Sequence, residues 1–197
     1  CWAERRRSKA FGGSGPAARS ALRPPHRENP LSRPGISLAP SGRAPLHLRH
    51  LVLDYNGTLA CRGRLLPGVV ERLRALGELV AVHVITLDTF GSARAELAGE
   101  LAAGNGVSLD VVDGCAGGEA EAKLALLQSL GPDRCCAVGN GANDGLMLEA
   151  AALSICVMGR EGCAVDTLRR AHICVADIGD ALDLLLYPES CAATLRR

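Results

Sequence analysis

Short, continuously apolar runs alternate with amphipathic segments from about residue 50 to near the C-terminus. The runs have the length and β-branched content of buried strands, and we expect strands at 51–54, 79–86, 107–112, 135–139, 153–158 and 172–175. Apolar residues at three- and four-residue spacing predict helices at 67–76, 92–103, 119–130, 144–151, 164–170 and 178–186. Buried strands joined by helices predict an α/β fold with three layers, a Rossmann-like, doubly wound and mostly parallel sheet.

Polar residues follow several of the predicted strands directly. The first strand ends at Asp54, which opens the segment Asp54-Tyr55-Asn56-Gly57-Thr58-Leu59. The second strand ends in Thr86-Leu87, and the fourth is followed by Asn140-Gly141-Ala142-Asn143-Asp144. Right-handed crossovers place these strand ends on one edge of the sheet, where ligands of such folds bind. A fixed carboxylate followed by a glycine and a hydroxyl suits an in-line attack on phosphorus.

Each of these residues also has a purely structural interpretation. Asn56-Gly57 is a common hairpin turn, and Thr86 is an ordinary β-branched strand residue. Lys123 suits an exposed helix face, and Asn143 or Asp144 suits a helix N-cap. We interpret Asp88 as such a turn or capping residue.

The order and spacing of these segments, together with Lys123 near the start of a helix, resemble the haloacid dehalogenase superfamily of phosphohydrolases. Within it, the closest likeness is to the phosphorylation domain of P-type ATPases and to the small soluble P-type ATPase-like hydrolases. The resemblance covers about residue 48 to the C-terminus. It implies a Mg²⁺-dependent phosphohydrolase of the phosphatase type, which forms an aspartyl-phosphate on Asp54.

The resemblance also implies roles for individual residues. The implied catalytic residues are Asp54 as nucleophile, with Asn56, Thr86 and Lys123. The implied phosphate-binding residues are Gly57, Thr58, Thr86, Leu87 and Lys123. The implied ligands of Mg²⁺ and its waters are Asp54, the backbone carbonyl of Asn56, Asn140, Asn143 and Asp144.

Two residues depart from the pattern of that superfamily. Asn56 stands where its phosphatases carry an Asp that acts as general acid and base, and losing such a group commonly costs about 10²–10⁴ in rate. Asn140 stands where an Asp would bind the metal, so a charge is missing there. We therefore expect slow turnover. The alternative is a phosphate-sensing or protein-interaction module on a catalytically weakened fold.

The intervals between the motifs are too short for a cap domain. Only 27 residues separate Thr58 from Thr86, and 36 separate Thr86 from Lys123. The predicted site is therefore open, and ion pumping is excluded. We expect a small phosphorylated substrate or a phosphoprotein as partner, and a homo-oligomer is one way to cover the site. Arg62 and Arg64 lie where they could contact a leaving group.

Charge divides the 197-residue chain into a basic leader and an acidic domain. Residues 1–49 hold ten Lys/Arg and two Asp/Glu (+8), whereas residues 50–197 hold twelve and nineteen (−7). We expect residues 1–46, rich in Arg, Pro, Gly and Ser, to be a dispensable disordered tail, and 47–197 to be the hydrolase domain. The tail resembles a transit peptide, but the first residue, Cys1, suggests a fragment or a misplaced start. Nucleic-acid binding by this arm is the least favoured hypothesis.

Nine cysteines show neither CxxC nor paired spacing, and Cys156 and Cys174 lie inside apolar runs. This pattern indicates small buried hydrophobic residues in a reducing compartment, so we expect a cytoplasmic protein. The longest apolar stretches are too short or too interrupted for a membrane span.

Overall fold

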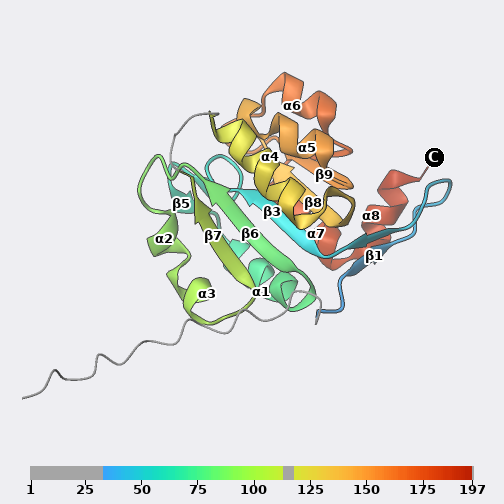
Figure 1. Cartoon of the computed structure of the whole chain (residues 1–197), viewed down its shortest axis with the longest axis horizontal. Coiled ribbons are helices and arrows are strands. Elements are labelled where there is room, and N and C mark those ends of the chain that lie inside the picture. The colour runs from blue at the N-terminus through green and yellow to red at the C-terminus, as the bar shows by residue number, and fades with distance from the viewer. Residues whose placement is uncertain (1–32, 113–117, 197) are drawn as a thin grey trace, which may run out of the picture.

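Six parallel strands form the central sheet, in the order β10-β9-β8-β3-β6-β7 (Figure 1). The computed structural model describes residues 33–112 and 118–196. The strands of this sheet are β3 (His50–Asp54), β6 (Ala81–Thr86), β7 (Val107–Val111), β8 (Cys135–Gly139), β9 (Leu153–Val157) and β10 (Ile173–Val175). Two hairpins accompany it, formed by β1 (Ile36–Leu38) with β2 (Leu46–Leu48) and by β4 (Ala60–Cys61) with β5 (Arg64–Leu65).

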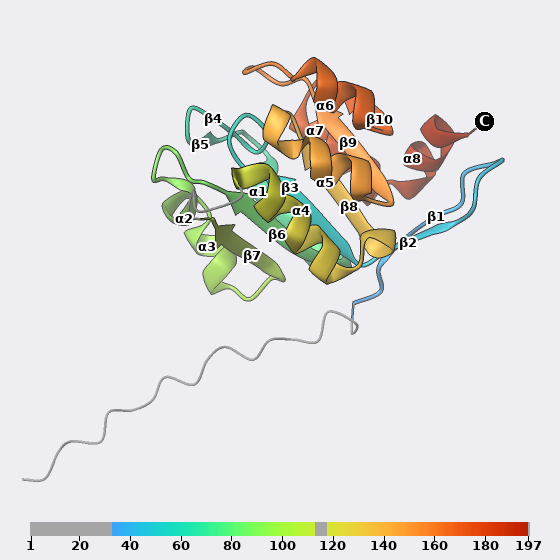
Figure 2. The ribbon, with the colours of Figure 1, turned by 45° about the horizontal axis from the view of Figure 1, so that its top comes forward.

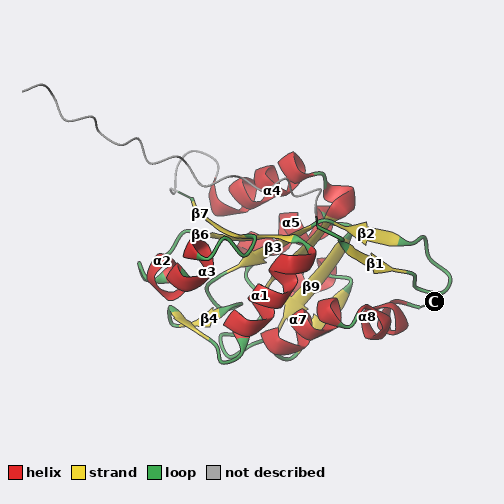
Figure 3. Cartoon of the chain, turned by 90° about the horizontal axis from the view of Figure 1, so that it is seen from below, coloured by secondary structure: helices red, strands yellow, loops and turns green. Residues whose placement is uncertain are grey.

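Helices cover both faces of the sheet. Figure 3 shows α1 (Val69–Leu79) and α7 (Ile178–Leu186) on one side, with α4 (Gly118–Leu130) and α5 (Gly145–Ala150) on the other. α6 (Val165–Arg170) packs beside α5, and α2 (Ala93–Glu96) and α3 (Ala98–Ala102) precede the edge strand β7. α8 (Pro188–Leu195) packs against β1 at the end opposite the β4–β5 hairpin (Figure 2). The predicted three-layer, doubly wound parallel fold is confirmed.

Burial on both faces explains the continuously apolar strands. In β3, Leu51 and Leu53 enter the core on the α1 and α7 side, whereas Val52 enters the core on the α4 and α5 side. All three side chains are at most 1% exposed. Alternate residues of a strand point to opposite faces, so both faces must be apolar when both are covered.

The chain order of the strands creates a switch point between β3 and β8. From β3 the chain moves outward through β6 to β7, then returns to β8 on the other side of β3 and moves outward to β10. Asp54 ends β3 and Asn140 directly follows β8, so these residues flank the switch point. Open α/β sheets bind ligands at this point, outside the carboxyl ends of the strands.

Several predicted boundaries differ from the structure, and one helix was not predicted. α1 continues to Leu79, beyond the predicted end at residue 76, so β6 begins at Ala81 instead of residue 79. α1 begins at Val69 instead of residue 67, because Gly68 has a φ of 76°, outside the helical region. The predicted helix at 92–103 is divided at Leu97, a fully buried side chain whose backbone leaves helical geometry with a ψ of 2°. The C-terminal extension forms a further helix, α8, with Pro188 in its first turn, where the missing N–H costs no hydrogen bond.

Regular structure is already present before the predicted domain boundary at residue 46. Ile36–Leu38 forms β1, and Ile36 and Leu38 are buried beside α8. Two apolar positions separated by one polar residue were too short a pattern to indicate a strand in the sequence. Residues 1–32 of the predicted tail lie outside the described residues. Among those that are described, no helix combines the length and the apolar content needed to cross a bilayer.

Candidate active site

The turn after β3 brings the first motif into a tight loop at the switch point. Gly57 has a φ of 83°, and a Cβ built on it would lie 2.5 Å from Nδ2 of Asn140. Only glycine allows both this backbone conformation and this close approach. Beyond the turn, β4 and β5 form a two-residue hairpin whose central residues, Arg62 and Gly63, have φ values of 52° and 77°. Both positive values are typical of the tight turns that suit strand twist.

Lys123 forms the centre of a buried ionic cluster. Its Nζ lies 2.7 Å from Oδ1 of Asp54, 2.7 Å from Oδ1 of Asp144 and 2.9 Å from Oε1 of Glu119. The Lys123 side chain is fully buried, although lysine is usually an exposed residue of a helix that covers a sheet. Three carboxylates around one buried ammonium explain why this lysine points inward.

The charges in this cluster perturb each other. Burial, followed by repulsion from Asp144, raises the pKa of Asp54 to about 7, against the opposing effect of Lys123. Burial alone would lower the pKa of Lys123, but the charges of Asp54 and Asp144 outweigh it and raise that pKa. The ammonium therefore stays protonated, and the carboxylate of Asp54 is held in a strained electrostatic environment. Perturbed groups of this kind concentrate at functional sites.

Asp144 organises the loop after β8. Its Oδ2 accepts hydrogen bonds from the backbone N–H groups of Asn140 and Gly141, each at 2.8 Å. Its other oxygen accepts from Lys123, so both oxygens of this carboxylate have protein donors. Gly139 is required here as well, because a Cβ on it would lie 2.5 Å from the Asp144 carboxyl group. Asp144 therefore positions the loop and the ammonium.

Thr58 links the end of β3 to the loop after β8. Its Oγ1 lies 3.0 Å from Oδ2 of Asp54 and 3.1 Å from Oδ1 of Asn140. A hydroxyl has one proton, so it can donate to only one of these two oxygens at a time. Asn140 is held on its other side by the carbonyl of Gly162, which accepts from Nδ2 at 2.9 Å. The oxygens of Asp54 and Asn140 thus converge on one small region.

Asn56 and Thr86 form the second polar contact at this edge. Nδ2 of Asn56 donates to Oγ1 of Thr86 at 3.3 Å, and the same oxygen accepts from the backbone N–H of Asp88. Oδ1 of Asn56 is buried and has no hydrogen-bond partner within the described part of the chain. An orphaned buried acceptor is costly unless a ligand satisfies it.

Two observations fit a divalent cation at this site. Three carboxylates, those of Asp54, Asp144 and Glu119, surround a single ammonium, which leaves an excess of two negative charges. The candidate metal ligands here are hard oxygens, which Mg²⁺ prefers. They are the Asp54 carboxylate and the side-chain oxygen of Asn140, which share the Thr58 hydroxyl, and the unpartnered side-chain oxygen of Asn56. Only one of these donors is charged, and no group of three or more His, Cys, Asp or Glu suited to a metal occurs in residues 33–112 and 118–196.

The structure brings most of the predicted site residues into one network. Direct contacts join Asp54, Thr58, Lys123, Asn140 and Asp144. Asn56, in the turn after β3, contacts Thr86 at the end of the neighbouring strand β6. Gly57 lies in the turn between them.

The remaining predicted residues lie at the margin of this network. Leu87 follows Thr86 with a side chain that is 36% exposed, and Nδ2 of Asn143 donates to Oε2 of Glu119. Arg62 and Arg64 are exposed on the hairpin, and the backbone N–H of Arg62 donates to Glu161.

The sequence interpretation missed Glu119. Its carboxylate contacts both Lys123 and Asn143, and it lies four residues before Lys123 on the same helix. That spacing is the usual signal for an ion pair on a helix surface, and it was available in the sequence. Asp88 is the capping residue that we expected, since its Oδ1 accepts from the backbone N–H groups of Ser92 and Ala93.

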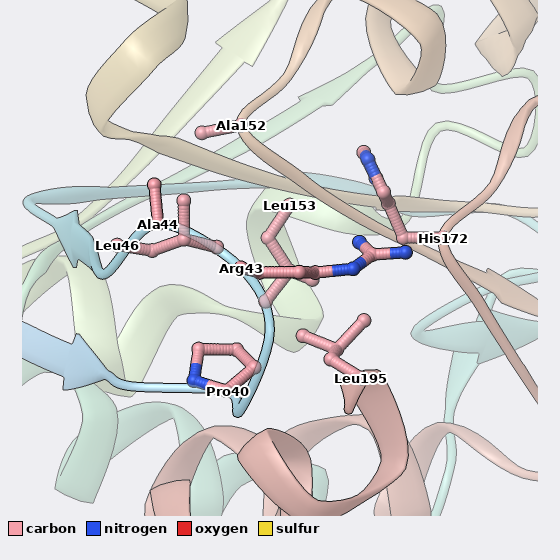
Figure 4. A pocket seen from close by; sticks show the side chains of 8 residues that line it. All are labelled: Pro40, Arg43, Ala44, Leu46, Ala152, Leu153, His172 and Leu195. Carbon is pink, nitrogen blue, oxygen red and sulfur yellow. The ribbon is translucent and has the colours of Figure 1, made fainter. Parts of the chain in front are cut away.

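A pocket of about 200 Å³ lies at the opposite end of the sheet, where β9 begins (Figure 4). Arg43 extends across it between Leu153 and Leu195, with His172 on one side. It is lined by Pro40, Arg43, Ala44, Leu46, Ala152, Leu153, His172 and Leu195. These residues come from the β1–β2 hairpin, the amino ends of β9 and β10, and α8, so the pocket is separate from the ionic cluster.

A doubly wound sheet with a carboxylate, a buried lysine and an Asn-rich loop at its switch point defines a hydrolase fold of the Rossmann-like type. The chain belongs to the haloacid dehalogenase-like hydrolase family, which matches residues 40–152. This match confirms the superfamily and the hydrolase class expected from the motifs.

Three known proteins are similar to this chain to different extents. An uncharacterised protein of Methanocaldococcus jannaschii is 45% identical over 84 residues, which are 41% of this chain and 90% of the relative. A phosphoserine phosphatase of Idiomarina loihiensis is 48% identical over 60 residues, which are 24% of this chain and 27% of that enzyme. The 3-deoxy-D-manno-octulosonate 8-phosphate phosphatase of Moraxella catarrhalis, solved with magnesium and phosphate, shares the fold with a TM-score of 0.50 and 15% identity. That similarity covers 73% of this chain and 88% of the other.

Proposed function

We propose that this protein is a Mg²⁺-dependent phosphatase that acts through an aspartyl-phosphate on Asp54. The observation that carries the proposal is the fully buried Lys123 ammonium between Asp54 and Asp144 at the switch point. A buried cation fixed beside a carboxylate nucleophile is suited to hold a phosphoryl group as charge moves between its oxygens. The phosphatase relatives point to the same chemistry.

The proposed reaction has two displacement steps at phosphorus. In the first, an oxygen of Asp54 forms a bond to phosphorus while the bond to the leaving oxygen breaks. In the second, a water oxygen attacks phosphorus, the bond to Asp54 breaks, and phosphate leaves. Since Asn56 transfers no proton, the leaving oxygen takes its proton from solvent and the attacking water releases one to solvent. Lys123 keeps its proton throughout and offsets charge on the phosphoryl oxygens, while Thr58 and Thr86 supply hydroxyl groups beside them.

Asp54, the carbonyl of Asn56 and Asn140 are the residues that would hold Mg²⁺, with Asn143 and Asp144 positioning the surrounding loop. The bound ion would supply Lewis-acid polarisation of the phosphoryl oxygens and offset the negative charge of nucleophile and substrate. The excess of two negative charges in the cluster supports a cation here. The orphaned side-chain oxygen of Asn56 is a separate acceptor that a water bound to this ion would satisfy.

Asn56 makes the proposed enzyme slow. A side-chain amide neither gives a proton to the leaving oxygen nor takes one from water near neutral pH. A substrate with a good leaving group therefore reacts fastest. This feature, with the Asn140-to-Asp144 segment, supports assignment to the P-type ATPase-like subtype, whose members also lack that acid.

Hydrolysis of para-nitrophenyl phosphate with Mg²⁺ tests the proposal. We expect slow release of phosphate that Asp54→Asn abolishes, because the isosteric amide removes the nucleophile without changing side-chain volume. Asn56→Asp should raise the rate by about 10²-fold or more, since it supplies the missing acid and base. Release that persists in Asp54→Asn would rule out this nucleophile.

A phosphate-binding module without turnover is the second candidate, and the two asparagines favour it. Beryllium fluoride mimics a phosphoryl group on a carboxylate and separates the two functions. Tight trapping that needs Mg²⁺ and Asp54, together with no phosphate release, would favour the module. Trapping together with release favours the enzyme.

We propose a small phosphorylated compound as the substrate, with a phosphoprotein as the alternative. Only the short β4–β5 hairpin and α1 lie between β3 and β6, which supports an open site. A second copy of the chain would then help to exclude water. The cytoplasmic location inferred from cysteine usage stays a prediction.

A further inference from the structure

Two cysteines that are seven residues apart lie in direct contact beside the candidate site. Sγ of Cys156 and Sγ of Cys163 are 2.6 Å apart. Cys156 is the fourth residue of β9 and is fully buried, whereas Cys163 lies in the loop after β9 and is partly exposed. A disulfide bond needs a sulfur separation of about 2.05 Å, so the two atoms have only about half an ångström to close.

The loop that carries Cys163 also supports Asn140. The carbonyl of Gly162 accepts from the Asn140 side chain at 2.9 Å, and the backbone N–H of Ala164 donates to the Asn140 carbonyl at 2.9 Å. On the other side of the pair, Cys156 is aligned with Gly139 in the parallel register of β8 and β9. The two sulfurs thus lie between β9 and the loop that contacts the Asn140 side chain.

The same loop anchors the β4–β5 hairpin. Oε1 of Glu161 accepts from the backbone N–H of Arg62 at 2.7 Å. A disulfide between Cys163 and Cys156 of β9 would therefore hold in place the loop that contacts both the Asn140 side chain and the hairpin.

We propose that Cys156 and Cys163 are a modification site that forms a reversible intrachain disulfide when a peroxide reaches the protein. Cys163, the accessible member, loses its thiol proton, its sulfur attacks one oxygen of the peroxide and the O–O bond breaks, which gives a sulfenic acid and a hydroxide that takes up that proton as water. The sulfur of Cys156 then attacks the sulfur of Cys163, the S–O bond breaks, and the hydroxide leaves as water with the Cys156 proton. Two thiols lose two electrons and two protons in total, and one hydrogen peroxide becomes two waters.

Cys174 is the natural competitor in this reaction. It is exposed on β10 and is aligned with Cys156 in the parallel register of β9 and β10. Neighbouring parallel residues in register point to the same face of the sheet, so a bond between Cys156 and Cys174 is the alternative product. The contact of 2.6 Å favours Cys163 as the partner of Cys156.

Peptide mapping after oxidation tests the proposal. The full chain is treated with one equivalent of hydrogen peroxide, the remaining thiols are blocked with N-ethylmaleimide, and the digest is analysed by mass spectrometry. We expect a linked peptide pair that contains Cys156 and Cys163, has lost two hydrogens, and separates again with dithiothreitol. Alkylation of Cys163 in the folded protein should be lost after oxidation and return after reduction.

Three variants make the result specific. Cys163→Ser should abolish the linked pair, whereas Cys61→Ser, which alters another partly buried thiol, and Cys174→Ser should retain it. The proposal is overturned if Cys174 replaces Cys163 in the linked pair, or if Cys163 proceeds to a sulfinic acid without a link. It is also overturned if Cys163 stays fully alkylated while Cys61 is oxidised. None of these outcomes depends on phosphatase activity.

Discussion

The buried lysine offers the sharpest test of the electrostatic interpretation. Replacing Lys123 with Met keeps the length and the apolar stem of the side chain but removes its charge. The carboxylates of Asp54, Asp144 and Glu119, which lie within 2.9 Å of the ammonium, would then face one another without compensation. We expect a large loss of folding stability as well as loss of phosphate chemistry.

The size of this loss follows from the distances. Oδ1 of Asp54 and Oδ1 of Asp144 are each 2.7 Å from Nζ, so they are separated by no more than twice that distance. Two like charges at about 5 Å repel by about 3 kcal/mol at an effective dielectric constant of about 20. Removing one partner of a buried ion pair typically costs about 3–5 kcal/mol, and we expect Lys123→Met to lower the free energy of unfolding by that amount.

Urea denaturation followed by circular dichroism, with EDTA present, measures the effect. A loss of about 4 kcal/mol lowers the unfolding midpoint by about 2 M for a slope of about 2 kcal/mol per molar urea. Arg169→Met is the matched control, because its pair with Asp166 is exposed and 3.5 Å long. Exposed pairs contribute little, so this control should change stability by less than about 1 kcal/mol.

A second substitution separates charge from packing. Lys123→Met combined with Asp54→Asn removes one of the three stranded carboxylates and should recover part of the lost stability. A loss below about 1 kcal/mol in Lys123→Met would contradict strong repulsion among the three carboxylates, as would a double variant that is no more stable than the single one. Either result would mean that the cluster is well solvated or is held by packing alone.

Three further predictions concern other parts of the molecule. Gly57→Ala should destabilise the protein by about 1–3 kcal/mol and reduce Mg²⁺-dependent activity, because a positive φ and a close contact with Asn140 oppose a methyl group. Thermal unfolding measures the loss of stability, and phosphate release measures the loss of activity. Burial, and to a smaller extent the charge of His50, lowers the pKa of His83 from 6.5 to about 4. The unfolded chain therefore binds this proton more readily, so the free energy of unfolding is highest above pH 6.5 and decreases by about 3 kcal/mol as the pH falls to 4. His83→Gln should flatten this pH dependence in urea unfolding. Glu119→Gln should keep the fold and leave the Lys123 ammonium with two carboxylates. The excess negative charge of the cluster is then smaller, so we expect a lower affinity for Mg²⁺ in a calorimetric titration. Unchanged affinity would mean that Glu119 has no influence on the cation.

The fold could be predicted because its signals are local and repeated. Continuous apolar runs such as the one that forms β8 occur only where both faces of a strand are covered, and parallel connection then determines which strand ends meet. The boundaries at Gly68 and Leu97 could not be predicted in the same way. They depend on a single backbone conformation and on one buried anchor, and both are set by tertiary packing.

The site was partly predictable for the same reason. The placement of Asp54, Thr86 and Asn140 follows from strand topology. The inward orientation of Lys123 depends on Asp54 and Asp144 from distant segments, together with Glu119 of its own helix. The contact between Cys156 and Cys163 could not be predicted from spacing, because it requires the loop after β9 to fold back onto its own strand.

The two asparagines change the charge balance of the site in a way that bears on the proposed chemistry. With Asn56 and Asn140, three carboxylates face one ammonium, and one divalent cation would balance the two negative charges that remain when all three are ionised. With aspartates at both positions the excess would be four, which would bind a cation more tightly but would repel a phosphate dianion more strongly. In the proposed enzyme, the two asparagines therefore lower metal affinity and remove proton transfer, and they weaken the repulsion towards phosphate. A good leaving group needs no acid in the first step, whereas attack by water in the second step still needs a base. With such substrates we therefore expect the aspartyl-phosphate to form and then persist.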